Sequence, residues 1–241
     1  MAERLIDVRG ISAGYSGVPV VRHLDLYLEP GEVVALLGAN GAGKTTTLLS
    51  ISGLVKCLEG SIEVLGGPVP FGAPHKVARR GLAHVAEDRS LFFQLSVEEN
   101  LKLGLRGSRS GQREGMNRAL DLLPALAPLM DRRAGLLSGG EQQMLAVARA
   151  LVGNPKVLMV DEMSLGLAPV IVERLLPIVR RIADDANVGV LFVEQHIHMA
   201  LGIADRAYVL SHGECVLEGR GSDLHERRDL LEASYLGDAA L

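Results

Sequence analysis

The chain has 241 residues, of which 48% are hydrophobic and 22% charged, and its formal net charge is −4. This length and apolar content can bury a substantial core, which excludes a disordered chain. Acidic and basic residues are mixed along the sequence, so no basic surface is indicated and nucleic acid is not expected as a partner. The two cysteines, Cys57 and Cys215, lack metal-ligand spacing, which fits free thiols in a reducing compartment.

Membrane contact is expected only through another protein. No apolar stretch approaches the roughly 20 residues that a membrane-spanning helix needs. Residues 1–8 interleave charged and apolar side chains, unlike a secretory signal peptide. We therefore expect the chain to reach a bilayer by docking on a partner that crosses it.

The N-terminal segment, to about residue 35, is predicted to form short strands of an antiparallel β lobe. Apolar and polar residues alternate over 23–29, and Pro30 with Gly31 marks a turn. An apolar run over 33–37 then leads into a glycine-rich loop and a helix. A further short strand is expected over 60–66.

The glycine-rich loop is the strongest functional signal. Residues 38–45 match G-x-x-x-x-G-K-[ST] at every fixed position, directly after a buried strand. Glycines let successive backbone N–H groups face an anion, and a helix opening near Gly43 adds its positive end. This pattern predicts that Lys44 reaches the β- and γ-phosphates of a nucleoside triphosphate and that Thr45 ligates Mg²⁺. The residues expected to contact the nucleotide here are Gly38, Ala39, Asn40, Gly41, Ala42, Gly43, Lys44, Thr45 and Thr46.

Residues from about 88 to 136 carry helical signals and are expected to form an inserted lobe. A capping box over 96–99 opens one helix, and apolar residues over 119–123 continue the helical pattern. Residues 106–113 are basic and rich in glycine and serine, which favours a solvated loop. The run 91–95 holds two of the four phenylalanines, which either lie buried under the lobe or face a docked partner.

Two acids close a later buried strand. The apolar run 157–160 ends in Asp161 and Glu162, although one acid would suffice to make a strand end polar. A triphosphate site needs a carboxylate at a neighbouring strand end to hold Mg²⁺, so Asp161 is the candidate ligand. Glu162 follows on the other side of an extended strand end, which makes it the candidate general base for the attacking water.

The remaining elements predict the core sheet. Strands over 157–160 and 189–193 alternate with helices, and a short strand over 215–218 precedes polar helical segments. We expect an α/β fold over 1–241 as a single domain. Its parts are a P-loop nucleoside triphosphatase core with a mostly parallel sheet, an N-terminal antiparallel β lobe and the inserted α-helical lobe over about 88–136.

A second anion site is indicated at residues 137–143, which read L-S-G-G-E-Q-Q before an apolar helical pattern. Serine and two glycines at a helix start offer free N–H groups and the positive end of the helix dipole. The motif resembles the signature sequence of ATP-binding-cassette (ABC) ATPases, and the other motifs follow in that family's order. The resemblance implies that Ser138, Gly139 and Gly140 contact ATP.

The resemblance covers nearly the whole chain and implies further roles. Tyr15 resembles the aromatic residue that stacks on adenine, and His196 resembles the histidine that contacts the γ-phosphate. Residues 164–169 occupy the place of a loop that crosses the dimer interface in this family.

Two positions depart from the family pattern. Glu87 stands where most members have glutamine, and it is expected to ligate Mg²⁺ or orient water while adding negative charge near the triphosphate. Met163 stands where proline is usual, so the following turn lacks a fixed φ and we expect altered loop stiffness.

Local sequence choices resemble the ATP-binding subunits of branched-chain amino-acid importers, in particular the shorter of their two paralogous ATPases. The stretches that carry this resemblance are Glu87, 97–101, 164–169, 193–196 and 234–237. It implies an ATPase at the cytoplasmic face of the membrane that powers uptake of branched-chain or other hydrophobic amino acids. Its implied partners are transmembrane permease subunits and an extracytoplasmic solute-binding protein. The alternatives are an importer for urea or amides, and an exporter.

The two anion sites also predict pairing. One domain cannot readily aim the loop near residue 41 and the motif near residue 138 at the same triphosphate, whereas two copies placed head to tail can. A second ABC ATPase subunit, identical or paralogous, is therefore expected. In the systems that the chain resembles, two different ATPases usually pair, which favours a heterodimer.

Overall fold

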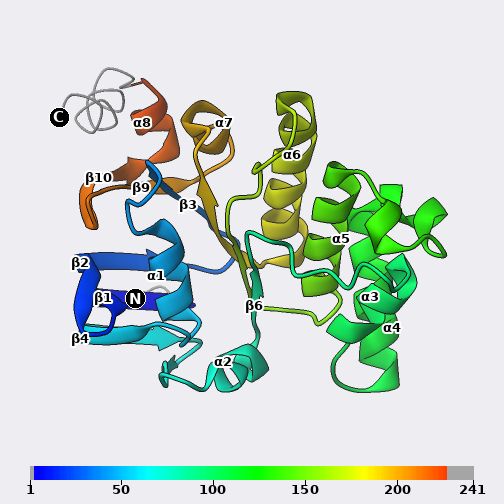
Figure 1. The fold of residues 1–241 in the computed structure, drawn as a ribbon, viewed down its shortest axis with the longest axis horizontal. Helices are drawn as coiled ribbons and strands as arrows, with labels where there is room; N and C mark the ends of the chain where they lie inside the picture. The colour runs from blue at the N-terminus through cyan, green and yellow to red at the C-terminus, as the bar shows by residue number, and fades with distance from the viewer. Residues whose placement is uncertain (1–2, 227–241) are drawn as a thin grey trace.

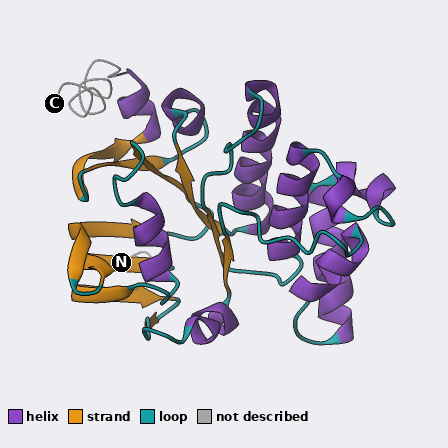
Figure 2. Ribbon diagram, in the orientation of Figure 1, coloured by secondary structure: helices purple, strands orange, loops and turns teal. Residues whose placement is uncertain are grey.

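The structure is a computed structural model that describes residues 3–226. The stretch 234–237 used above lies outside the described residues. The larger sheet stands nearly edge-on in Figure 1, with the smaller sheet and α1 (Lys44–Ile51) on one side and the longer helices on the other. Figure 2 shows how the strands gather on one side of the molecule and helices fill the other.

The smaller sheet is antiparallel, as predicted, with the order β2-β1-β4-β5. Its strands are β1 (Ile6–Tyr15), β2 (Val18–Leu28), β4 (Lys56–Val64) and β5 (Gly67–Pro68). Leu24, Leu26 and Leu28 are buried with polar neighbours between them, which confirms the predicted alternation. The strand expected over 60–66 begins earlier, at Lys56, because β4 pairs with β1 along most of its length.

The larger sheet has the order β10-β9-β3-β8-β7-β6, and only β10 runs antiparallel to its neighbour. Its strands are β3 (Val33–Gly38), β6 (Leu82–Val85), β7 (Val157–Val160), β8 (Gly189–Glu194), β9 (Arg206–Ser211) and β10 (Glu214–Arg220). The mostly parallel sheet is confirmed. Strand β9 was not predicted, although its apolar run over 207–210 is as long as the run over 157–160 that was assigned to a strand.

Helices cover the larger sheet and build the lobe beside it. In addition to α1, they are α2 (Pro74–Arg80), α3 (Val97–Gly104), α4 (Arg109–Leu122), α5 (Gly139–Leu151), α6 (Pro169–Ala186), α7 (Ile197–Leu201) and α8 (Gly221–Glu226), with short 3-10 helices at Pro124–Leu129 and Ala134–Leu136. Helices α3, α4 and α5 cluster at one end of the molecule (Figure 1). Within residues 3–226, every helix is too short or too polar to cross a bilayer.

One prediction about the inserted lobe is wrong. Residues 109–113, predicted as part of a solvated loop, form the first turns of α4, and the Ser108 hydroxyl accepts a hydrogen bond from the Gly111 N–H at 3.3 Å. The polar composition concealed this helix because its buried face consists of Gly115, Ala119 and Leu122, which lie mostly in its later turns. The predicted capping box between Ser96 and Glu99 is confirmed.

Alternating side chains of β3 separate two hydrophobic cores. Val34 and Leu36 pack with α1 and the smaller sheet, whereas Val33, Ala35 and Leu37 pack with the helical side. Both faces of β3 are therefore buried, as expected for a central parallel strand. The carboxyl end of β3 is consequently fixed in place, and there the chain enters the phosphate loop.

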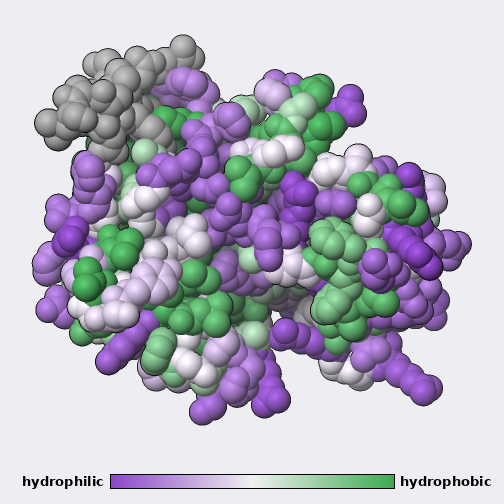
Figure 3. Space-filling view, viewed as in Figure 1, coloured by the Kyte–Doolittle hydropathy of each residue, from purple (hydrophilic) through white to green (hydrophobic). Residues whose placement is uncertain are grey.

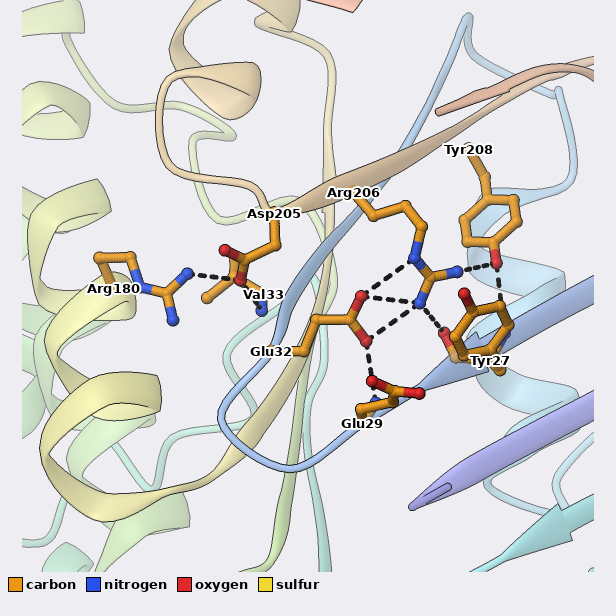
Figure 4. A network of polar contacts seen from close by, with 8 residues as sticks. All are labelled: Tyr27, Glu29, Glu32, Val33, Arg180, Asp205, Arg206 and Tyr208. Atoms are coloured by element: carbon orange, nitrogen blue, oxygen red, sulfur yellow. Dashed lines mark hydrogen bonds and ion pairs between the residues drawn. The ribbon is translucent and has the colours of Figure 1, made fainter. Parts of the chain in front are cut away.

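A polar network fastens the two sheets together near the start of β3 (Figure 4). Arg206 forms an ion pair with Glu32 at 2.8 Å and donates to the Tyr27 carbonyl at 2.9 Å. Its guanidinium also lies over the Tyr27 ring, 3.5 Å from the centroid, which adds a cation–π contact. These contacts join β9 to the end of β2 and leave the opposite, carboxyl end of the parallel strands free for a ligand.

Candidate nucleotide-binding site

Close packing requires glycine at two positions of the phosphate loop. A Cβ at Gly38 would lie 2.4 Å from the Leu210 carbonyl oxygen, and one at Gly43 would lie 2.9 Å from the Val21 side chain. Both residues have positive φ, 155° and 102°. Larger residues would displace the loop from the strand end, so both glycines fix the loop geometry that phosphate binding needs.

Lys44 begins α1 and bends back over the loop. Its Nζ donates hydrogen bonds to the Gly38 carbonyl at 2.8 Å and the Ala39 carbonyl at 2.9 Å, and its side chain is almost fully buried. Burial lowers the pKa of Lys44, while the nearby carboxylates, Glu162 first, raise it. The ammonium group is therefore held where the β- and γ-phosphates of a nucleotide are expected.

Asp161 lies directly beside Thr45, as the sequence predicted. The Thr45 hydroxyl donates to Asp161 Oδ1 at 3.3 Å, joining the start of α1 to the end of β7. Burial raises the pKa of Asp161 to about 6, against the opposing effect of the Thr45 hydrogen bond. A buried carboxylate in this state is unfavourable unless a cation or proton accompanies it.

Glu162 lies close to Lys44, but its backbone is not extended as expected. Strand β7 ends at Val160, and Glu162 has a left-handed backbone with φ 44°, so it does not continue an extended strand end. Its Oε1 lies 3.8 Å from Lys44 Nζ. The carboxylate therefore shares the phosphate side of the site with Lys44. Its role as general base remains a prediction.

Three other predicted residues lie at the margins. Glu87 is exposed in the turn after β6, yet its charge is close enough to raise the pKa values of Lys44 and Asp161. Tyr15 ends β1 and His196 precedes α7, and both are exposed. Among the described residues no hydrogen bond joins these three side chains to the phosphate loop, so their roles remain predictions.

The signature motif begins α5. Ser138 caps the helix, and its backbone N–H and hydroxyl each donate to Glu141 Oε2 at 2.7 Å. These hydrogen bonds from Ser138 lower the pKa of Glu141. Within residues 3–226, no hydrogen bond or ion pair links Ser138, Gly139 or Gly140 to the phosphate loop. The contact of these three residues with ATP stays a prediction.

Sequence reasoning missed a buried acid beside these loops. Glu194 ends β8 with no exposed surface, and its Oε2 accepts hydrogen bonds from the Ser164 hydroxyl at 2.7 Å and the Gln195 N–H at 3.1 Å. The available signal was an acid closing the apolar run 190–193. Met163, the departure from the family pattern, is buried in the larger core and so anchors the loop that begins with Ser164.

A groove of about 590 Å³ lies between the core and the helical lobe, lined by β6, α2, α3 and α5. Figure 3 shows the hollow between the lower part of the molecule and the lobe. The run 91–95 divides here: Leu91 is buried, Phe92 is exposed and lines the groove, and Phe93 is exposed beyond it. Arg106 and Arg149 supply the cationic part of the lining, which contains no carboxylate among the described residues.

The ABC transporter family model matches residues 21–164, more than half of the chain, and spans the phosphate loop, the signature motif and the acidic strand end. The chain belongs to the ABC transporter family. Membership makes it an ATPase and confirms ATP as its nucleotide. The motifs therefore occur in a member of the family whose motif order they follow.

Individual relatives support this family assignment for the ABC ATPase. It is 39% identical to the high-affinity branched-chain amino acid transport ATP-binding protein BraG of Pseudomonas aeruginosa, over 94% of this chain and 97% of the relative. It is 33% identical to the lipopolysaccharide export system ATP-binding protein LptB of Escherichia coli K12, over 97% of both chains. The structure of cbiO1 from Clostridium perfringens matches with a TM-score of 0.83 at 23% identity, over 96% and 94% of the chains, which supports the fold.

Proposed function

We propose that this ABC ATPase powers the import of branched-chain or other hydrophobic amino acids through separate permease subunits. Its 39% identity to BraG along nearly the full length of both chains carries the substrate proposal. The 33% identity to LptB supports an exporter as the second candidate. An importer for urea or amides is another alternative, because it would hydrolyse ATP at the same kind of site. The proposed location is the cytoplasmic face of the membrane.

The oxygen donors at the strand end fit Mg²⁺. The Thr45 hydroxyl and the Asp161 carboxylate are hard oxygen ligands that already lie 3.3 Å apart. Burial of Asp161 without a paired cation makes an incoming cation favourable. Thr45 and Asp161 would hold the ion, and Glu87 is the further candidate ligand. The bound ion would neutralise charge on the phosphates.

The chain's own residues have separate tasks in hydrolysis. The glycine loop and Lys44 bind the phosphates, and Tyr15 stacks on the adenine. Glu162 orients a water molecule and accepts its proton as the water attacks the γ-phosphate. His196 is the proposed additional contact to that phosphate. The 3.8 Å separation of Glu162 Oε1 from Lys44 Nζ supports this role for Glu162.

Pairing with a second ATPase completes the proposed site. Within residues 3–226, no hydrogen bond or ion pair joins the signature motif of one chain to its own phosphate loop, and the motif's Gly140 packs so closely on Ile171 that an added Cβ would lie 2.7 Å from that side chain. Head-to-tail pairing would place Ser138, Gly139 and Gly140 against nucleotide held by the other cassette. Light scattering of Glu162→Gln with ATP and Mg²⁺ tests self-pairing. A chain that binds nucleotide but remains monomeric would indicate a paralogous partner.

The groove is the proposed permease contact. Phe92 provides exposed apolar surface, and Arg106 and Arg149 provide positive charge at its edge. A short cytoplasmic segment of a membrane subunit, apolar with an acidic residue, fits this lining. Phe92→Asp should therefore weaken permease binding, whereas Val216→Asp on β10 is a control at a similarly exposed apolar residue away from the groove.

A pull-down of the tagged chain from its native membrane tests the function, with mass spectrometry of the retained proteins. Two multi-span permeases, a second ABC ATPase and an extracytoplasmic solute-binding protein support import, and the solutes bound by that last protein test the substrate class. Retention of permeases with export components, and no solute-binding protein, supports the exporter. Loss of all membrane proteins from the wild-type sample contradicts a transport role.

A further inference from the structure

The turn after β6 has an unusual backbone. Arg89 and Ser90 are consecutive non-glycine residues with positive φ, 62° and 46°. Left-handed backbone is unfavourable for residues other than glycine, so the surrounding structure must hold this turn in place. The turn spans residues 87–90, so it includes Glu87, and Ser90 borders the groove.

The Arg89 side chain crosses from this turn to two other functional segments. Its Nε donates to Gln143 Oε1 at 2.8 Å and its Nη1 to Gln142 Oε1 at 3.3 Å, both in the first turns of α5. Its Nη2 donates to the Leu165 carbonyl at 3.1 Å. One guanidinium group therefore joins the start of the signature helix to the loop 164–168.

Arg149, near the end of α5, holds the same turn from the other side. Its Nη1 donates to the Ser90 carbonyl at 2.8 Å and its Nη2 to the Arg89 carbonyl at 3.0 Å. Arg149 also lines the groove proposed for the permease. The strained turn is thus attached to both ends of α5 by two arginines.

Geometry, more than charge, defines the Arg89 contacts. All three acceptors are neutral, and among the described residues Arg89 forms no ion pair with a carboxylate. Gln143 is almost fully buried, so its amide oxygen depends on this donor. A planar guanidinium can reach three acceptors at fixed angles, whereas a lysine ammonium group is a compact charge on a flexible stem.

The contacts continue to both segments expected to face a second cassette. Gln142 Nε2 donates to the carbonyl of Leu137, the residue before Ser138, at 3.3 Å. On the other side, Leu165 follows Ser164, whose hydroxyl is bound by the buried Glu194 carboxylate. Arg89 is therefore placed between the Glu87 turn, the signature motif and the loop 164–168.

We propose that Arg89 is a positioning residue that fixes the signature motif and the loop 164–168 relative to the Glu87 turn. This inference rests on the proposed head-to-tail pairing, because both segments act on nucleotide held by another chain. Arg89 touches no nucleotide itself. Its loss leaves binding of ATP to the chain's own phosphate loop intact but misplaces the segments that complete the paired site.

The test compares Arg89→Ala and Arg89→Lys with the wild-type chain, and uses Arg113→Ala, an exposed arginine on α4, as the matched control. Hydrogen–deuterium exchange without nucleotide should be faster by about tenfold in peptides covering 137–143 and 163–168 of both Arg89 variants, because the guanidinium hydrogen bonds to Gln142, Gln143 and Leu165 are lost. ATP binding to the single chain should be unchanged. The kcat for ATP should fall by about tenfold, with lysine giving no rescue.

Each outcome decides the inference. Local exchange that rises only in these two segments, with a lower kcat and unchanged ATP affinity, supports it. Unchanged exchange, rescue by lysine, unchanged kcat, or exchange raised equally throughout the chain would overturn it. If the wild-type chain shows no turnover under any condition, the proposed function fails, and the exchange comparison alone still decides whether Arg89 positions the two segments.

Discussion

The starts of α1 and α5 both carry glycines and both belong to anion-binding motifs, yet they differ in their free state. Gly43 caps α1 without any side-chain hydrogen bond, and no acid lies in its first turn. Ser138 caps α5 in a complete capping box with Glu141. The first helix start therefore keeps its N–H donors for an external anion, whereas the second satisfies the Ser138 and Glu141 N–H groups with its own side chains.

The two regions also differ in the direction in which the pKa of their acidic residues is shifted. Burial raises the pKa of Asp161, beside α1, to about 6, whereas hydrogen bonds from Ser138 lower the pKa of Glu141 on α5. The region proposed to hold the nucleotide is thus unfavourable when empty, whereas the region proposed to meet another chain is stable alone. ATP hydrolysis should accordingly depend on the first region, whereas the capping box of the second should add modestly to the stability of the free chain.

The largest expected effect is on turnover and concerns the first region. Glu162→Gln removes the proposed general base, so ATP hydrolysis should fall by about 10²–10⁴-fold. Nucleotide binding should remain, because Lys44 and the loop are unchanged. Phosphate release and nucleotide affinity measure the two effects. Glu173→Gln, at an exposed position on α6, is the control, and equal activity in the two variants would exclude Glu162 as the base.

The sequence predicted much of this first region because its residues are close along the chain or follow the ends of parallel strands in one sheet, although β8 lies between β3 and β7. The loop 38–45 is continuous, and Asp161 follows an apolar run whose parallel pairing brings it near Thr45. The direction of Glu162 was not predictable in the same way. Its position depends on a left-handed backbone, and no residue type at that position signals such a turn.

Long-range side-chain contacts were the other limit of the sequence. Arg89 and Gln143 are 54 positions apart, and Ser164 and Glu194 are 30 apart, so no local pattern connects them. Helix α4 was partly missed because glycine, serine and arginine dominate its beginning, although Ser108 supplies an ordinary cap. These features depend on tertiary packing, which overrides local composition.

The second-largest expected effect is on the free energy of unfolding, and it comes from the buried Asp161 carboxyl in the empty site. The ordinary pKa of Asp161 is 3.8 and the raised pKa is about 6. Between these two pH values the folded chain keeps a proton on Asp161 that the unfolded chain releases. Stability from this residue is therefore present below about pH 4 and lost as pH rises to about 6. Without metal or nucleotide, Asp161→Asn should be more stable at neutral pH by up to about 3 kcal/mol.

Chemical unfolding of both chains in metal-free buffer measures this difference. The advantage of Asp161→Asn should disappear near pH 4, where the wild-type carboxyl is protonated in both states. Addition of Mg²⁺ and ATP should reverse the order, because only the wild-type carboxylate can pair with the cation. A variant that is less stable than wild type at neutral pH would show that Asp161 supports the empty fold.

The smallest expected effect concerns the second region, where the two capping boxes of α5 and α3 form a matched pair. Glu141→Ala and Glu99→Ala each remove the acid that accepts from the cap residue's N–H, so each should cost about 0.5–1 kcal/mol in urea unfolding. Only Glu141 also holds the Ser138 hydroxyl, at 2.7 Å. If pairing requires that hydroxyl to turn toward the nucleotide of the other chain, Glu141→Ala should lower the KM for ATP while Glu99→Ala leaves it unchanged. A higher KM in Glu141→Ala would mean that the capping box persists in the paired state, and that Ser138 meets the nucleotide with its cap intact.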